Sequence, residues 1–142
     1  MRPTDLPFNA MLGLRDAPSG AAHLLELPWH DRLRNHVGTM HAAAQFALAE
    51  AASAECLLRE FPDLAPGLLA VVRHVELRYR RAATGDAFAH ARPAAGAAEQ
   101  LRADLAARGR AFVTVDVELR DAGGAVSFAG KFTWYLSREA AG

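Results

Sequence analysis

Hydrophobic and polar residues alternate along this chain with two different periods. Between residues 39 and 61, apolar side chains that are mostly alanine recur at helical spacing. Pro62 cannot continue a helix and restricts the residue before it, so we expect this long helix to end by Phe61. We place its start near Thr39, because a threonine that follows a glycine is a good N-cap.

From Val71 onward the period changes to two, which is typical of strands with one buried and one exposed face. The alternating segments are 71–80, 87–91, 113–119 and 126–136. Between the second and third of them, residues 97–108 return to helical spacing and stop at Gly109. A turn at residues 121–124 joins the last two strands as an antiparallel pair.

The first part of the chain carries weaker signals. Residues 6–14 predict a short helix or turn. Residues 23–27 and 31–34 predict two short strands. Together the elements predict a single α+β domain over residues 1–142, in which the long helix covers one face of an antiparallel sheet. The alanines of that helix would let the sheet approach closely and wrap around it.

Composition restricts the class of protein. The chain is 51% hydrophobic and 23% charged, which is typical of a globular protein. Its 16 basic and 16 acidic residues balance, which argues against a general nucleic-acid binder. The single cysteine, Cys56, cannot form an internal disulfide and is expected to fill space in the core or an interface.

No signal-peptide pattern opens the sequence, and no apolar stretch of membrane-spanning length is free of charge. We therefore expect a soluble, cytoplasmic protein without a membrane partner. A metal site is not expected, because His36 and His41 are five residues apart and have no cysteine–histidine cluster beside them.

The candidate chemistry lies between Asn35 and Glu50. An amide, two imidazoles and a glycine turn precede the long helix, which then carries one carboxylate, Glu50, in an apolar run. Burying such a group is costly unless something compensates its charge, so Glu50 calls for an explanation. On the residues alone, a solvated glutamate is the commoner outcome. Asn35 and Gly38 have a structural alternative as well, because both residue types tolerate the left-handed backbone conformation that a turn before the helix requires.

The motif Asn35-x-x-Gly38-Thr39-x-His41-Ala42-Ala43, followed by Leu48-Ala49-Glu50, resembles the hotdog-fold acyl-CoA thioesterase superfamily, in particular its PaaI-like and DUF4442-like branches. The strand plan after Val71 is similar over most of the remaining chain. Many PaaI-like members have Gly-Gly in place of Ala42-Ala43, but alanine keeps the backbone N–H that the family uses as an oxyanion donor. The resemblance implies a hotdog fold, with a sheet wrapped around a central helix. It also implies a homodimer, or a homotetramer built from two dimers.

Spacing bears on how such a site is assembled. His41 and Glu50 are nine residues apart, which is about half a turn out of phase and roughly 13 Å along a helix. They are therefore not expected to meet on one face of one helix. Either they are unrelated, or they come from two protomers.

The resemblance implies that the site is shared between two protomers, with Asn35, His41 and the Ala42 amide from one subunit facing Glu50 of the other. The amides would polarise the thioester carbonyl of an acyl-CoA or acyl-carrier substrate. Glu50 would activate water or attack directly.

Further substrate contacts are expected at Gly38 and Thr39, and Arg81 is the candidate for the phosphates of coenzyme A. The alternative is that Arg81 is simply exposed to solvent at the end of a strand and has no role in binding. No cofactor is expected, and the sequence does not indicate the acyl group.

Two other functions compete with hydrolysis. One is a hotdog dehydratase or hydratase of 3-hydroxyacyl thioesters, because His36 precedes Glu50 by the fourteen residues found in those enzymes. The glycine- and proline-rich segment that accompanies that pair is missing here. The other is a dimer that binds acyl thioesters without catalysis.

Overall fold

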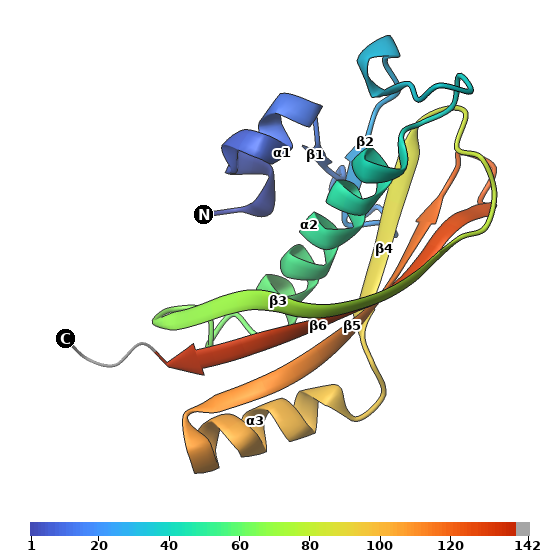
Figure 1. Cartoon of the computed structure of the whole chain (residues 1–142). Coiled ribbons are helices and arrows are strands. Elements are labelled where there is room, and N and C mark those ends of the chain that lie inside the picture. The colour runs from blue at the N-terminus through green and yellow to red at the C-terminus, as the bar shows by residue number, and fades with distance from the viewer. Residues whose placement is uncertain (139–142) are drawn as a thin grey trace.

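The computed structural model describes residues 1–138, and its main feature is a six-stranded antiparallel sheet curved around one long helix (Figure 1). The elements, with η for a 3-10 helix, are η1 Pro3–Asp5, α1 Pro7–Leu12, β1 Arg15–Asp16, β2 Leu25–Leu27, η2 Asp31–Leu33, α2 Ala42–Glu60, β3 Leu68–Tyr79, β4 Ala87–Pro93, α3 Ala97–Arg108, β5 Arg110–Arg120 and β6 Val126–Arg138. The strand order is β1-β2-β4-β5-β6-β3, so β3 lies at one edge. The predicted α+β architecture is confirmed.

The core lies between α2 and the concave face of the sheet. On β5 the residues that alternate inward are buried, and Phe128 and Phe132 of β6 are fully buried beside them. Small residues on α2, including Ala49 and Ala52, are also fully buried, which allows the sheet to pack closely against the helix. Cys56 is buried in this core, as expected of a filler.

Helix α2 ends where the sequence predicts but begins later. Its last residue is Glu60, directly before Phe61. Its first residue is Ala42 with His41 as N-cap, so the prediction of a start near Thr39 is wrong. The reason is tertiary: the Met40 N–H donates to the Ala83 carbonyl at 2.8 Å, and the His41 N–H donates to the Leu33 carbonyl at 2.7 Å. These bonds hold the chain extended up to the cap.

The region before α2 differs from the sequence prediction in a second place. The predicted strand at 23–27 is present as the shorter β2, but the predicted strand at 31–34 is wrong, because residues 31–33 form η2. There the Leu33 N–H donates to the His30 carbonyl and the Arg34 N–H to the Asp31 carbonyl. Local turns therefore use the backbone groups that a strand would have paired.

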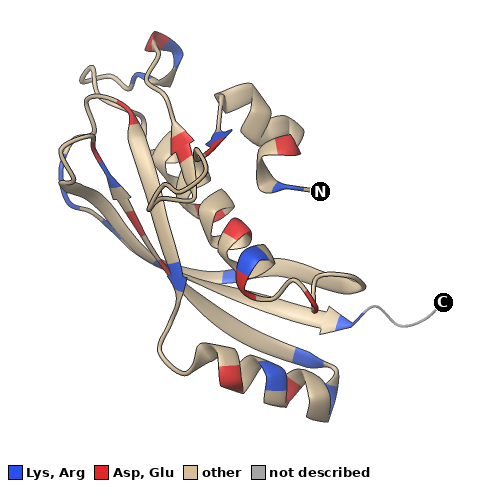
Figure 2. Ribbon diagram, turned by 180° about the vertical axis from the view of Figure 1, so that it is seen from behind, with Lys and Arg blue, Asp and Glu red and all other residues tan. Residues whose placement is uncertain are grey.

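The N-terminal segment, η1 and α1, packs against α2 on the side away from β5 and β6 (Figure 1). This agrees with the short helix predicted for residues 6–14. Lys and Arg are interspersed with Asp and Glu over the strands and α3 (Figure 2). None of the helices within residues 1–138 has the length and apolar character that a membrane crossing requires.

Candidate active site

Glu50 is the carboxyl group on α2 whose pKa the fold raises. Its side chain is partly buried, and burial raises the pKa of its carboxyl group above the ordinary value of 4.5. Within residues 1–138 no cation or hydrogen-bond donor compensates the charge, and burial is the only cause of the shift. A carboxyl group kept in this state is suited to take up a proton.

A polar link fixes the helical turn that carries Glu50. The indole N–H of Trp134 on β6 donates to the Ser53 hydroxyl at 3.0 Å. That hydroxyl donates in turn to the Glu50 backbone carbonyl at 2.7 Å. The link crosses the core from sheet to helix, so it sets both the position and the rotation of α2 at this turn.

An open, largely apolar groove runs between α2 and β3, and it contains several of the predicted site residues. Glu50, His41 and Ala42 all line it, together with Phe46 and Val72. Lining one open groove does not bring the two side chains into contact, so the expectation that His41 and Glu50 do not meet on one face of one helix stays a prediction. His41 is the N-cap, with an extended backbone at φ −58° and ψ 137°, so helical phase does not apply to it.

The start of α2 leaves one backbone donor without a partner. His41 Nδ1 accepts the Ala43 N–H at 3.0 Å, and the His41 carbonyl accepts the N–H groups of Ala44 and Gln45. Among residues 1–138 nothing accepts the Ala42 N–H, which lies at the positive end of the helix dipole. Because Nδ1 accepts, the neutral His41 ring carries its proton on Nε2.

Asn35, Gly38 and Thr39 build the turn ahead of the helix rather than the groove. The Asn35 carbonyl oxygen accepts the N–H groups of Val37 and Thr39, both at 3.0 Å, and its amide donates to the Thr39 hydroxyl at 2.9 Å. Gly38 has φ +84°, a conformation that strongly favours glycine. None of these three residues lines the groove of this chain.

His36 and Arg81 are also outside the groove. His36 is exposed in the same turn, and Arg81 is exposed just after β3 ends. The groove of one chain therefore unites Glu50 with His41 and Ala42 but with none of the other predicted residues.

Sequence reasoning missed three residues that shape the groove. The Tyr79 hydroxyl on β3 donates to the Ala42 carbonyl at 3.1 Å and so holds the helix start against the edge strand. Phe8 and Asn9 of α1 line the groove from the opposite side. Tyr79 carried one usable signal, its place on the inward side of the β3 alternation. Phe8 and Asn9 carried none.

Comparison with known proteins agrees with this architecture. The sequence profile of DUF4442, described as a domain of unknown function, matches residues 18–136. The chain belongs to the DUF4442 family. No curated protein matches the sequence.

Solved structures resemble this DUF4442 protein over most of its length. A Pseudomonas aeruginosa protein named a probable thioesterase is 28% identical with a TM-score of 0.81, over 96% of this chain and 91% of that one. A Haemophilus influenzae thioesterase is 17% identical with a TM-score of 0.72, over 95% and 85%. A Bacillus halodurans protein solved with CoA is 16% identical with a TM-score of 0.64, over 79% and 69%. The predicted hotdog fold is thereby confirmed, and the similar structures include thioesterases.

Proposed function

We propose that this DUF4442 protein is an acyl-CoA thioesterase whose active site forms between two protomers. One observation carries the proposal: an uncompensated carboxyl group, Glu50, lies in the same apolar groove as the unsatisfied N–H of Ala42. Thioester hydrolysis needs both a base and an oxyanion donor. The similarity to thioesterases and to a CoA-bound structure supports the same chemistry.

In the proposed reaction Glu50 takes a proton from water, and the resulting hydroxide attacks the thioester carbonyl carbon. The carbonyl oxygen becomes an oxyanion, which the Ala42 N–H and the helix dipole stabilise. When the tetrahedral intermediate collapses, the carbon–sulfur bond breaks and the thiolate of CoA leaves, accepting from Glu50 the proton that the carboxylate took from water. The products are a carboxylic acid and the free thiol.

Two protomers are needed because one chain holds the two groups too far apart. Ala42 and Glu50 are eight residues apart on α2, which corresponds to about 12 Å of helix rise. One carbonyl cannot contact the amide and the carboxylate of the same helix at catalytic distance. A two-fold axis beside the groove would bring the helix start of one subunit to Glu50 of the other.

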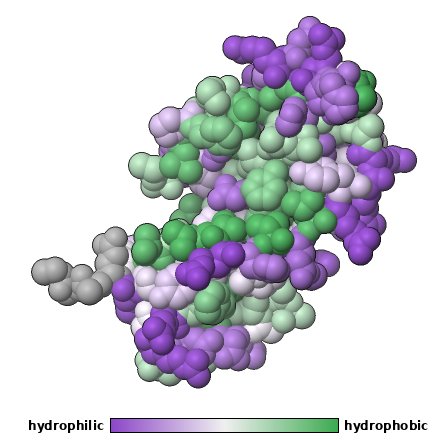
Figure 3. Space-filling view, viewed as in Figure 1, coloured by the Kyte–Doolittle hydropathy of each residue, from purple (hydrophilic) through white to green (hydrophobic). Residues whose placement is uncertain are grey.

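The edge strand β3 offers the surface on which such a dimer can form. It is twelve residues long, and its outer edge has no strand partner among residues 1–138. Its apolar side chains are unusually exposed, with Leu69 at 49% and Tyr79 at 46%. Figure 3 shows a hydrophobic band along β3. Long, apolar, unprotected edges pair with other chains, so we place the dimer interface here.

The remaining predicted residues have supporting roles in this proposal. Asn35, Gly38 and Thr39 form the turn that positions His41 and the helix start, and in the dimer this turn lies near the substrate. Arg81, exposed beyond β3, would bind a phosphate of CoA. If so, Arg81→Ala raises KM for acyl-CoA but not for acyl-pantetheine, which lacks the nucleotide phosphates.

The deciding experiment is a screen of acyl-CoA substrates with a thiol-trapping reagent. We expect thiol release by the native protein and a loss of about 10²- to 10⁴-fold in Glu50→Gln, the range for removal of a general base. Glu60→Gln is the matched control, because Glu60 is exposed at the end of the same helix.

Each alternative function has its own outcome in this screen. Undiminished thiol release by Glu50→Gln would remove Glu50 from the mechanism. Tight acyl-CoA binding with no turnover by the native protein would indicate a non-catalytic binder. A dehydratase releases no thiol, so conversion of 3-hydroxyacyl-CoA to the 2-enoyl thioester by the native protein, with near-complete loss of that activity in His36→Ala, would favour the dehydratase alternative.

A further inference from the structure

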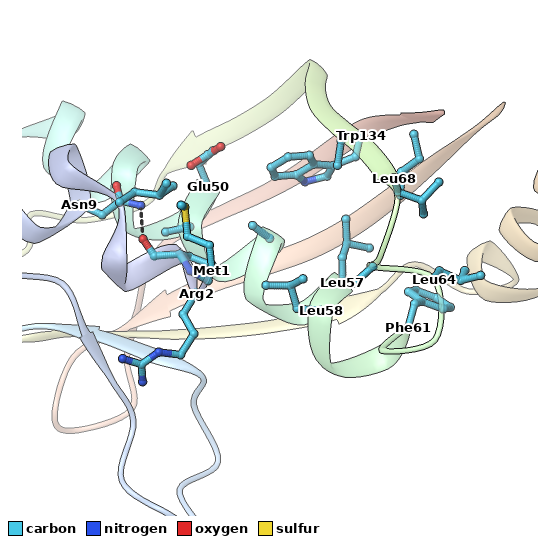
Figure 4. Close-up of a pocket in the computed structure, with 17 residues that line it drawn as sticks. Met1, Arg2, Asn9, Glu50, Leu57, Leu58, Phe61, Leu64, Leu68 and Trp134 are labelled. Atoms are coloured by element: carbon cyan, nitrogen blue, oxygen red, sulfur yellow. Dashed lines mark hydrogen bonds between the residues drawn. The ribbon is translucent and has the colours of Figure 1, made fainter. Parts of the chain in front are cut away.

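A second cavity opens on the other side of Glu50. Its volume is about 350 Å³, and it lies between the C-terminal half of α2, the N-terminal segment and the ends of β3 and β6 (Figure 4). Glu50 and Asn9 line both this cavity and the groove, so the two spaces adjoin at these residues. A molecule whose reacting carbon lies at Glu50 can extend into the cavity on one side and along the groove on the other.

The walls of the cavity are mostly apolar, and most of the lining side chains are aliphatic. Leu57, Leu58 and Ala54 line it from α2, and Trp134 and Leu136 line it from β6. Arg2 also borders it, but the guanidinium turns away from the apolar side chains (Figure 4) and pairs with Asp5 and Asp16. Apart from Arg2 and the amino group of Met1 at its border, Glu50 is the charged group that the described residues present to this space.

The cavity is elongated. Figure 4 shows Glu50 at one end, beside Asn9 and Met1, and Phe61 and Leu64 at the other. Glu50 and Phe61 are eleven residues apart along α2, which corresponds to about 16 Å. A cavity of about 350 Å³ that follows this length of helix suits an extended chain better than a compact group.

The N-terminal segment closes this channel opposite the sheet. Leu6 and Pro3 line it, and hydrogen bonds hold the segment in place. The Asn9 amide donates to the Pro3 carbonyl at 2.9 Å, and the Thr4 hydroxyl donates to Asp16 at 3.1 Å. The channel wall is therefore a fixed part of the structure, with apolar side chains turned inward.

We propose that this channel holds the acyl chain of the substrate, that the preferred acyl group is an unbranched aliphatic chain of medium length, and that Leu6 and Ala54 limit that length. The proposal rests on the thioesterase function proposed above. The thioester would lie at Glu50, the alkyl tail would run toward Phe61, and the pantetheine arm would leave along the groove. A charged or polar acyl chain would find no partner in the channel.

The test compares kcat/KM for butyryl-CoA, octanoyl-CoA, palmitoyl-CoA and benzoyl-CoA. We expect octanoyl-CoA to be preferred. Ala54→Phe and Leu6→Trp should each lower the octanoyl-to-butyryl ratio at least tenfold by filling the channel. Leu6 is 41% exposed, so its replacement is well tolerated by the fold if Ala54→Phe is not. Ala106→Phe, at an exposed position of α3, is the control and should leave the ratio unchanged.

A binding measurement separates this proposal from the catalytic one. Calorimetry on Glu50→Gln should show octanoyl-CoA binding more tightly than CoA, by up to about fourfold for each methylene buried. The gain should shrink in the Glu50→Gln, Ala54→Phe double variant. Equal affinity for octanoyl-CoA and CoA, or an unchanged ratio in both folded channel variants, would overturn the channel assignment whether or not Glu50 is the base.

Discussion

At the scale of a single residue, Glu50 links activity to a cost in stability. Burial raises its pKa, so the folded protein holds the proton more tightly than the unfolded chain does. Below the ordinary glutamate pKa both states are protonated and there is no penalty. As the pH rises through the raised pKa of the folded state, ionisation destabilises the fold. The carboxylate that the reaction needs is therefore formed at the expense of stability.

This argument predicts the pH dependence of Glu50→Gln. A neutral glutamine has no ionisation penalty, so the variant should have a higher Tm than the native protein at pH 7 to 8. The difference should disappear near pH 4, where the native carboxyl group is protonated. Thermal unfolding followed by circular dichroism at both pH values measures the effect, with Glu60→Gln as the exposed control. A Tm difference of equal size at both pH values would show that packing, not charge, is responsible.

At the scale of elements, the backbone N–H of Ala42 at the start of α2 can be removed by substitution with proline. Ala42 is the first residue of the helix, where proline is well accepted, and the extended His41 suits the position before a proline. Since the Ala42 N–H has no partner among residues 1–138, Ala42→Pro breaks no intramolecular hydrogen bond. We expect stability within about 0.5 kcal/mol of the native value. We expect kcat to fall by about 10²- to 10³-fold, the loss for one oxyanion donor.

Steady-state kinetics and denaturant unfolding of Ala42→Pro check both expectations. Ala42→Gly is the companion variant, because it keeps the N–H and should lose far less activity than the proline. An active, stable Ala42→Pro protein would mean that this amide does not contact the oxyanion.

The elements that the sequence predicted well are those whose signals are local. The alternation in β5 and β6 and the Gly109 stop of α3 depend on neighbouring residues, and the structure confirms them. The start of α2 was misplaced because Met40 is held by Ala83, which lies far along the chain. The strand predicted at 31–34 failed for a different reason, since local turns there use the backbone groups that a strand would have paired.

At the scale of the whole molecule, the candidate site was only partly readable from the sequence. Glu50 was visible as a carboxylate in an apolar run, and His41 and Ala42 by their place at a helix start. The contact of Tyr79 with the helix start was not, because its bond to Ala42 joins residues 37 positions apart in the sequence. Phe8 and the channel walls come from segments that only the fold brings to α2. Which groups share one site depends on tertiary and quaternary contacts that no local pattern encodes.

The quaternary arrangement can be tested with two inactive variants. If each site takes Glu50 from one subunit and the Ala42 N–H from the other, a mixed dimer of Glu50→Gln and Ala42→Pro contains one intact site and one doubly disabled site. After subunit exchange at equal amounts, half of the dimers are mixed, so activity should recover to about a quarter of the native value. If both groups acted within one chain, every site in the mixture would stay disabled.

Val71→Lys provides the control for this recovery. Val71 is 39% exposed on the edge strand β3, and a lysine there should oppose pairing of two edges. With Val71→Lys in both chains, size-exclusion chromatography with light scattering should report monomers, and mixing should restore nothing. Full activity of Val71→Lys alone, in an otherwise native chain that is monomeric, would contradict the shared site. Such a result would mean that Glu50 and the Ala42 N–H act within one subunit, despite the helix rise of about 12 Å (about eight residues) between them.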